Sequence, residues 1–152
     1  MRCEIPNIGP LDIETVILDL NGTIAIDGVL IEGVKELVEE LCKHFRVLLF
    51  TGDTHRNGGL IAKELGIEMR LTPDAEAKAE EATKLNPETC AAIGNGRIDL
   101  EMFKVVRLPI AVILQECAWT ETVNASKIQS TSIIDALNLL LKPKRLIATM
   151  RK

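Results

Sequence analysis

Residues able to take part in phosphoryl transfer stand at the ends of three apolar runs of this sequence. Asp19 follows one run, Thr51 ends a second and Asn95 a third, and each has a glycine close by. An aspartate carboxylate can act as a nucleophile, although an aspartate after a strand is more often only a turn former. Together with Lys78 and Asp99, the three residues have the order and spacing that a phosphoryl-transfer site on a parallel sheet needs.

The segments between these residues alternate between short apolar runs and runs with helical periodicity. The pattern predicts strands at 15–20, 46–52, 67–71, 90–96 and 108–114, and helices at 32–44, 60–65 and 132–141 and after residue 72. Such alternation is typical of parallel β-α units with right-handed crossovers. We therefore expect an α/β fold, a single domain over residues 1–152 in which a Rossmann-like parallel sheet lies between two layers of helices. Ligands bind beyond the carboxyl ends of such strands.

Local signals set the expected ends of two helices. Thr72 is expected to cap the helix that follows it, with Pro73 in the first turn of that helix. The helix at 132–141 is expected to close the domain before Pro143, and the basic segment after it to be a solvated helix or tail.

A short hairpin is expected near the first aspartate. The sequence TIAIDGVL (23–30) has Asp27-Gly28 as its turn. The interval up to residue 51 otherwise holds one helix, so no cap domain fits. The hairpin would then be a flap over an open site, and its apolar residues could pack against another protomer in a homo-oligomer or within its own core.

Composition excludes several classes of protein. The chain has 152 residues, a net charge of -4 with interspersed signs, and 47% hydrophobic and 26% charged residues. The sequence has no basic stripe, so we expect no nucleic-acid partner. No apolar run reaches the roughly 18 residues of a membrane span, so we expect no membrane segment. The first residues do not have the pattern of a signal peptide. We therefore expect a cytoplasmic protein. The four cysteines are far apart and without C-x-x-C spacing, which predicts free, buried thiols.

Four ordered motifs resemble those of the haloacid dehalogenase superfamily. They are DLNGT (19–23), TGD (51–53), Lys78 and GNGRID (94–99). The similarity to the soluble, capless, P-type-ATPase-like phosphatases of this superfamily extends through the tail SIIDALNLLLKPKRLIATMR (132–151).

The resemblance implies a magnesium-dependent phosphohydrolase that acts on a phosphorylated small molecule or phosphoprotein. Asp19 would be the nucleophile and form an aspartyl-phosphate, with Thr51, Gly52 and Lys78 holding the phosphate. A hard cation prefers oxygen ligands, and the implied ligands of Mg²⁺ are Asp19, Asn21 through its backbone carbonyl, Asn95 and Asp99. Asp53 would either support these residues from behind or be an acid at the N-terminus of the following helix.

Three residues depart from the superfamily pattern. Asn21 replaces an aspartate that serves superfamily phosphatases as general acid and base, and an amide cannot transfer that proton. Asn95 replaces a carboxylate near the metal, and Ile98 replaces a polar residue. We expect slow turnover and a preference for good leaving groups. Asn21 and Asn95 each precede a glycine, so deamidation could restore both acids.

Two other interpretations stay open at this stage. One is the capless, oligomeric sugar-acid phosphatase type, which the short flap also resembles and against which Asn21 counts. The other is a catalytically degenerate member of the fold, which would bind phosphate or a nucleotide or serve as an assembly subunit. The two lost carboxylates and Ile98 favour the degenerate interpretation. The retained residues, Asp19, Thr51, Lys78 and Asp99, favour an enzyme.

Overall fold

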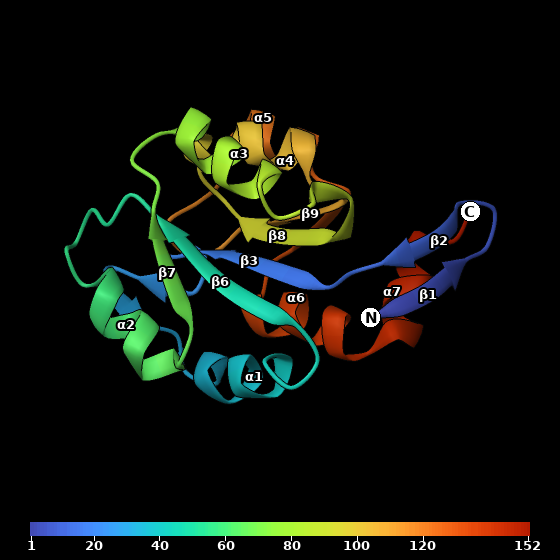
Figure 1. Ribbon diagram of the computed structural model, residues 1–152, viewed down its shortest axis with the longest axis horizontal. Coiled ribbons are helices and arrows are strands. Elements are labelled where there is room, and N and C mark those ends of the chain that lie inside the picture. The colour runs from blue at the N-terminus through green and yellow to red at the C-terminus, as the bar shows by residue number, and fades with distance from the viewer.

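A six-stranded, fully parallel sheet forms the centre of the computed structural model, which describes residues 1–152 (Figure 1). In spatial order its strands are β10 (Ile128–Ser130), β9 (Leu108–Val112), β8 (Cys90–Gly94), β3 (Thr15–Asp19), β6 (Arg46–Thr51) and β7 (Glu68–Leu71). Five of these strands are predicted by apolar runs. The sixth, β10, was not predicted, because it has three residues and only Ile128 is buried.

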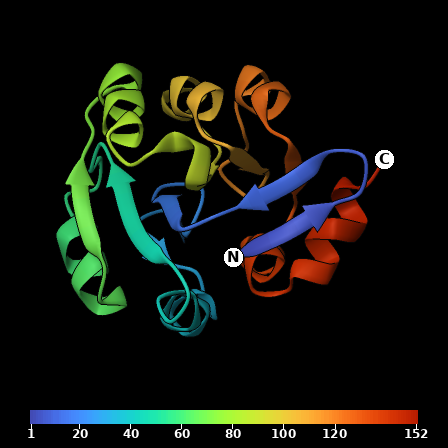
Figure 2. The same cartoon turned by 45° about the vertical axis from the view of Figure 1, so that its right-hand side comes forward.

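Helices cover both faces of the sheet, which confirms the expected three-layer arrangement (Figures 1 and 2). One layer holds α1 (Val34–Leu41), α2 (Gly58–Leu65) and α6 (Ile133–Leu141), and the other holds α3 (Ala75–Thr83), α4 (Leu100–Val105) and α5 (Thr120–Ala125). Two short 3₁₀ turns, Pro87–Thr89 and Arg97–Asp99, precede β8 and α4. None of the helices combines the length and the apolar character that a bilayer crossing requires.

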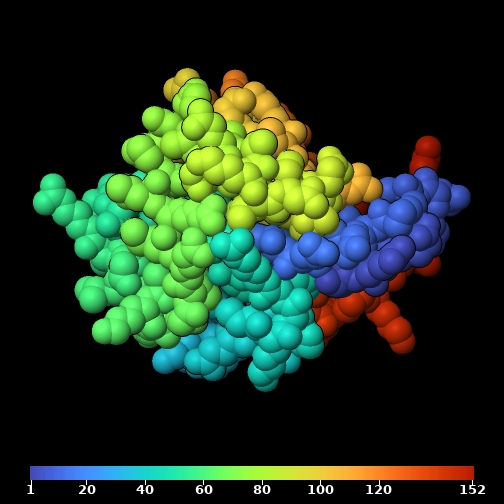
Figure 3. All heavy atoms as spheres, viewed as in Figure 1, coloured from blue at the N-terminus to red at the C-terminus, as the bar shows by residue number.

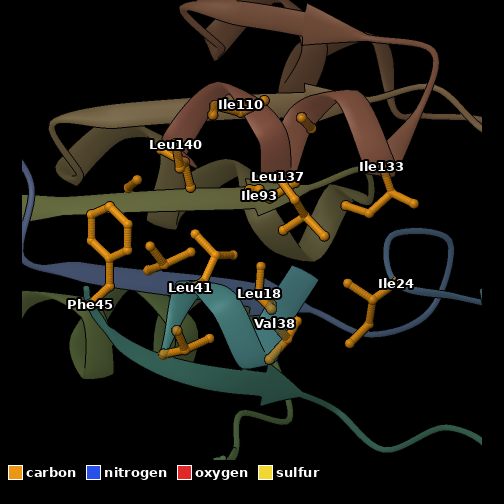
Figure 4. Close-up of a cluster of buried hydrophobic side chains, with 14 of the residues drawn as sticks. Leu18, Ile24, Val38, Leu41, Phe45, Ile93, Ile110, Ile133, Leu137 and Leu140 are labelled. Atoms are coloured by element: carbon orange, nitrogen blue, oxygen red, sulfur yellow. The ribbon is translucent and has the colours of Figure 1, made fainter. Parts of the chain in front are cut away.

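The four central strands, β9, β8, β3 and β6, are buried on both faces, and their alternate residues enter different cores. Val16 and Leu18 of β3 join the larger core, which packs against α1 and α6, whereas Ile17 between them joins a smaller core with Phe103 of α4. Figure 4 shows Leu18 facing side chains of α1 and α6 in the larger core. The alternation follows from the two-residue period of a strand, and burial on both faces explains why the runs are almost continuously apolar.

An N-terminal hairpin, β1 (Arg2–Ile5) and β2 (Gly9–Asp12), lies outside the sheet and was not predicted. It places Ile5 and Leu11 in the larger core beside a last helix, α7 (Pro143–Met150), whose Leu146 is fully buried. The expectation that the domain closes before Pro143 was therefore wrong. Pro143 begins α7, because proline fits the first turn of a helix, where its missing N–H is not needed.

The capping residue of α3 is Asp74, so the prediction for Thr72 was also wrong. The Asp74 carboxylate accepts a hydrogen bond of 2.8 Å from the backbone N–H of Ala77. Thr72 is fully buried, and its N–H donates to the carbonyl of Thr51 at 2.9 Å, which prolongs the contact of β7 with β6. Both residues are good capping types, and only the course of the backbone distinguishes them.

The predicted hairpin after Asp19 is confirmed as β4 (Ala25–Ile26) and β5 (Val29–Leu30). Its turn residues Asp27 and Gly28 have φ angles of 49° and 78°, the left-handed conformation that a tight two-residue hairpin turn requires. We call residues 25–30 the flap.

The cysteines are free, as predicted, but they are not all buried. Only Cys90 is buried, Cys3 is intermediate, and Cys42 and Cys117 are exposed. Wide spacing argued against a disulfide framework, but it carried no information about the burial of each thiol.

The cap assignment predicts that Asp74→Ala lowers the free energy of unfolding by about 1 kcal/mol, because the first turn of α3 loses its acceptor. Asp74→Asn keeps a side-chain oxygen and should stay near the parent. Urea unfolding of the three proteins measures the difference. Equal losses in both variants would contradict the capping role.

Candidate active site

The side chains singled out by the motifs meet at the carboxyl edge of the sheet. Asp19 ends β3, Thr51 ends β6, and Asn95 follows β8; β3 lies between β6 and β8 and pairs with both. Neighbouring parallel strands end side by side, so residues far apart in sequence gather over the middle of the sheet. Asp19 and Thr51 are 6% and 1% exposed, which places this cluster below the surface.

A buried lysine joins two carboxylates in this cluster. The Nζ atom of Lys78 on α3 donates hydrogen bonds of 2.7 Å to Oδ1 of Asp19 and 2.7 Å to Oδ1 of Asp99. Lys78 and Asp99 are fully buried. An ammonium group has three donors, so one donor of Lys78 is left for a further anion.

Burial changes the protonation behaviour of this group. Loss of solvent, helped by the negative charge of Asp99, raises the pKa of Asp19 to about 6 although Lys78 opposes the rise. For Lys78 burial alone would lower the pKa, but the two carboxylates outweigh it and raise the pKa above its usual range. With both carboxylates ionised and the ammonium group protonated, the three side chains carry a formal net charge of -1.

Asp99 braces the loop that follows β8. Its Oδ2 accepts hydrogen bonds from the backbone N–H groups of Asn95 and Gly96, at 3.0 and 2.9 Å. Its Oδ1 is bound to Lys78, so both carboxylate oxygens have protein partners. The contacts of Asp99 are thus those of a positioning residue, which holds Lys78 and Asn95 in place.

A threonine that the sequence analysis did not assign links Asp19 to Asn95. The hydroxyl of Thr23 lies 3.0 Å from Oδ2 of Asp19 and 3.1 Å from Oδ1 of Asn95. The Asn95 amide nitrogen donates to the carbonyl of Cys117 at 2.9 Å, which turns the amide oxygen toward Thr23. The only sequence signal for Thr23 is its place at the end of the DLNGT motif.

The oxygen atoms of Asp19, Asn21 and Asn95 are of the chemical types that bind a hard divalent cation. A hydroxyl carries one proton, so it can donate to Asp19 or to Asn95 at any moment, and the other oxygen keeps a free lone pair. The backbone carbonyl of Asn21 accepts no hydrogen bond within the chain, and the buried Oδ1 of Asn21 is also without a partner. Carboxylate, amide and carbonyl oxygens are the donors that Mg²⁺ prefers, and the net negative charge of the cluster attracts it.

The loop after β6 offers a free hydroxyl proton. Oγ1 of Thr51 accepts a 2.9 Å bond from the N–H of Asp53, which leaves its own O–H free to donate. Oδ1 of Asp53 accepts a 2.7 Å bond from the N–H of Gly58 at the start of α2. Asp53 therefore shapes the loop, while Thr51 and the adjacent Gly52 stand next to the cluster.

The flap turn is held from both sides by residues that sequence reasoning missed. The side-chain amide of Asn57 donates to the carbonyl of Gly28 at 2.7 Å, and the carboxylate of Glu116 accepts from the N–H of Asp27 at 3.1 Å. Val29, at the tip, remains 70% exposed. No local pattern marks Asn57 or Glu116, because their partner lies far away in the sequence.

The haloacid dehalogenase-like hydrolase family model matches residues 5–107, about two thirds of the chain. The protein belongs to this family. The chain is also 47% identical over 73 residues to an uncharacterised protein of Methanocaldococcus jannaschii, a match that covers 47% of this chain and 78% of that protein.

Solved structures share the fold of this hydrolase at low sequence identity. The cobalt-bound deoxy-D-mannose-octulosonate 8-phosphate phosphatase of Haemophilus influenzae has a TM-score of 0.73 at 17% identity, over 93% of this chain and 94% of that one. The 3-deoxy-D-manno-octulosonate 8-phosphate phosphatase of Moraxella catarrhalis, in complex with magnesium, phosphate and the sugar acid, has a TM-score of 0.68 at 22% identity, over 91% and 94%. A chain of this size with this fold is consistent with a capless hydrolase.

The structure argues against deamidation of this hydrolase at its two Asn-Gly steps. Ring closure needs the glycine nitrogen to attack the asparagine side chain, but the Gly22 N–H is bound to the carbonyl of Ala25 at 2.8 Å and the Gly96 N–H to Asp99 at 2.9 Å. These two hydrogen bonds disfavour ring closure at Asn21 and at Asn95.

The pKa of Asp19 predicts a pH-dependent difference in stability between the parent hydrolase and Asp19→Asn. A carboxyl with a raised folded pKa binds protons more tightly in the folded state, so its ionisation destabilises the fold as the pH rises from about 4 to 6. A rise from 3.8 to about 6 corresponds to about 3 kcal/mol. Asp19→Asn should gain stability relative to the parent across this window in urea unfolding with EDTA. A difference that is the same at both ends of the window would contradict the raised pKa.

Close packing predicts that Gly94→Ala disrupts the site while Gly96→Ala does not. A Cβ on Gly94 would lie 2.5 Å from Cγ of Asp99, whereas the nearest atom to a Cβ on Gly96 is 3.6 Å away. Gly94→Ala should lose about 1–3 kcal/mol of stability, and Gly96→Ala should stay within about 0.5 kcal/mol of the parent. Thermal unfolding of both variants measures this, and equal effects would contradict the packing argument.

Proposed function

We propose that this hydrolase is a magnesium-dependent phosphohydrolase in which Asp19 is phosphorylated during turnover. The observation that carries the proposal is the buried contact of Lys78 with Asp19 and Asp99 at the carboxyl edge of the sheet. A carboxylate fixed by a lysine, beside a free threonine hydroxyl, has the parts that phosphoryl transfer needs.

In the first step one carboxylate oxygen of Asp19 attacks phosphorus and the bond to the leaving oxygen breaks. The free donor of Lys78, the hydroxyl of Thr51 and the N–H of Gly52 would hold the phosphate oxygens while negative charge spreads over them. The pKa of about 6 keeps Asp19 mostly ionised at neutral pH, so the nucleophile is available without a base. Water then releases phosphate and restores the carboxylate.

The cation would be held by Oδ2 of Asp19, Oδ1 of Asn95 and the carbonyl of Asn21, whose free lone pairs support this assignment. When bound, it supplies positive charge that neutralises the phosphate and changes the net charge of the cluster from -1 to +1. Asp99 positions Lys78 and Asn95 in this scheme and does not need to contact the cation.

Asn21 shapes the kinetics in this proposal. Its amide can donate a hydrogen bond to the leaving oxygen, but it cannot protonate that oxygen or deprotonate the attacking water. Substrates with acidic leaving groups, such as aryl and acyl phosphates, should therefore react best. Hydrolysis of the aspartyl-phosphate should be the slow step, so the phosphorylated protein should accumulate.

The substrate is proposed to be a phosphorylated small molecule or a phosphoprotein. The flap is short and no cap domain covers the cluster, so nothing in the chain limits the size of the group beyond the phosphate. The fold is shared with phosphatases of 8-phosphorylated sugar acids, which supports phosphate monoesters as the class.

The discriminating experiment compares the parent with Asp19→Asn and Asn21→Asp on p-nitrophenyl phosphate and acetyl phosphate with Mg²⁺. We expect slow turnover in the parent, none in Asp19→Asn, and about 10²-fold faster turnover in Asn21→Asp, where an ionisable group returns. Peptide mapping after incubation with acetyl phosphate should find phosphate on the peptide that contains Asp19. Turnover that Asp19→Asn retains would exclude the nucleophile.

The same variants distinguish an enzyme from a degenerate member of the fold, which the two amides at Asn21 and Asn95 would suit. Phosphatase activity that is absent in the parent and present in Asn21→Asp would support the degenerate alternative.

Metal binding is tested separately from activity. Because Asn95 supplies no negative charge, Asn95→Asp should bind Mg²⁺ more tightly and show a larger Mg²⁺-dependent rise in melting temperature than the parent. The exposed Asn124 offers a matched control, and Asn124→Asp should leave the rise unchanged. A rise that is the same in all three proteins would contradict the ligand assignment.

A further inference from the structure

A cavity of about 310 Å³ lies between the N-terminal hairpin and α7. Ile5 and Leu11 of the hairpin line it and are 1% and 2% exposed, and Ile8 and Met150 stand beside them. Figures 2 and 3 show the hairpin and the C-terminal segment together at one end of the molecule. The volume falls in the range of pockets that hold small ligands, and an apolar lining favours an apolar chain.

Two cations without acidic partners complete the lining. Arg107 precedes β9 and donates to the carbonyl of Pro10 at 3.3 Å; Lys127 precedes β10 and donates to the carbonyl of Arg107 at 2.5 Å. Neither side chain forms an ion pair with a carboxylate. Loss of solvent and the charge of Arg107 lower the pKa of Lys127, and Glu88 offsets this only in part. An anion bound here would relieve the repulsion.

The cavity is separate from the proposed active site. Arg107 and Lys127 stand before the amino ends of parallel strands, whereas Asp19 stands at the carboxyl end of β3. A ligand in the cavity therefore cannot contact the reacting group, and its binding does not depend on the proposed phosphatase activity.

We propose that this cavity binds a single-chain amphipathic anion, with its oxyanion head on Arg107 and Lys127 and its alkyl chain among the apolar side chains. A neutral alkyl chain would leave both cations unpaired, and a small inorganic anion would leave the accessible parts of Ile8 and Met150 in contact with water. The combination of charge-assisted hydrogen bonds and apolar burial selects a ligand that has both parts.

Isothermal titration calorimetry of the full chain with decanoate, kept below micellar concentration, tests the proposal. We expect saturable binding at one site, weakened about tenfold or more in Lys127→Gln and in Arg107→Gln, because each substitution removes a hydrogen bond to a charged group. Lys63 on α2 is likewise exposed and forms no ion pair, so Lys63→Gln is the matched control and should bind like the parent.

Equal binding of decanol or of decyltrimethylammonium would overturn the assignment of the head group, and so would full affinity in Lys127→Gln. Binding to anionic lipid vesicles without binding to free decanoate would identify a membrane surface and overturn the proposal.

Because Arg107 also contacts the hairpin backbone, Lys127→Gln and Ile8→Ser decide the matter if Arg107→Gln fails to fold. Ile8 is 49% exposed, and Ile8→Ser should weaken binding by shortening the apolar contact.

Discussion

The ammonium group of Lys78, buried between the carboxylates of Asp19 and Asp99, is the contact on which the geometry of the site depends. A charge without water is tolerated only when hydrogen bonds and opposite charges replace the solvent, and Lys78 has both. Its two bonds tie α3 to the ends of β3 and to the turn before α4. Through the backbone bonds of Asp99, the same contact also fixes the loop that carries Asn95.

Ionisation of Asp19 serves the proposed chemistry but lowers the stability of the fold. Burial raises the pKa of Asp19 to about 6, so an ionised Asp19 at neutral pH costs folding free energy that a neutral side chain would not. The net charge of -1 attracts a cation. The hydroxyl of Thr23 can donate to only one of Asp19 and Asn95 at a time, so the other oxygen stays free to bind the cation. The two amides reduce the charge that a cation meets, and Asn21 removes the proton carrier. In the proposed mechanism these two features would favour formation of the phosphorylated intermediate over its hydrolysis.

The two edges of the sheet offer different chemistry. At the carboxyl edge, loops carry polar side chains and the flap turn is tied down by Asn57 and Glu116. At the amino edge, the N-terminal hairpin and α7 enclose an apolar cavity beside two cations. The sheet separates the two places, so a ligand at one can be studied without occupying the other.

The sequence by itself determined the alternation of strands and helices, because apolar periodicity is a local property. It also predicted the parallel sheet and the meeting of Asp19, Thr51 and Asn95 at one edge, because strands joined through helices run in the same direction. Only the tertiary structure decided which oxygens Lys78 binds, that Thr23 reaches Asn95 across 72 positions of sequence, that Asp74 rather than Thr72 caps α3, and that the first residues fold against α7. These features depend on pairing between segments distant in sequence. No periodicity within one segment encodes the partner that its side chains will meet.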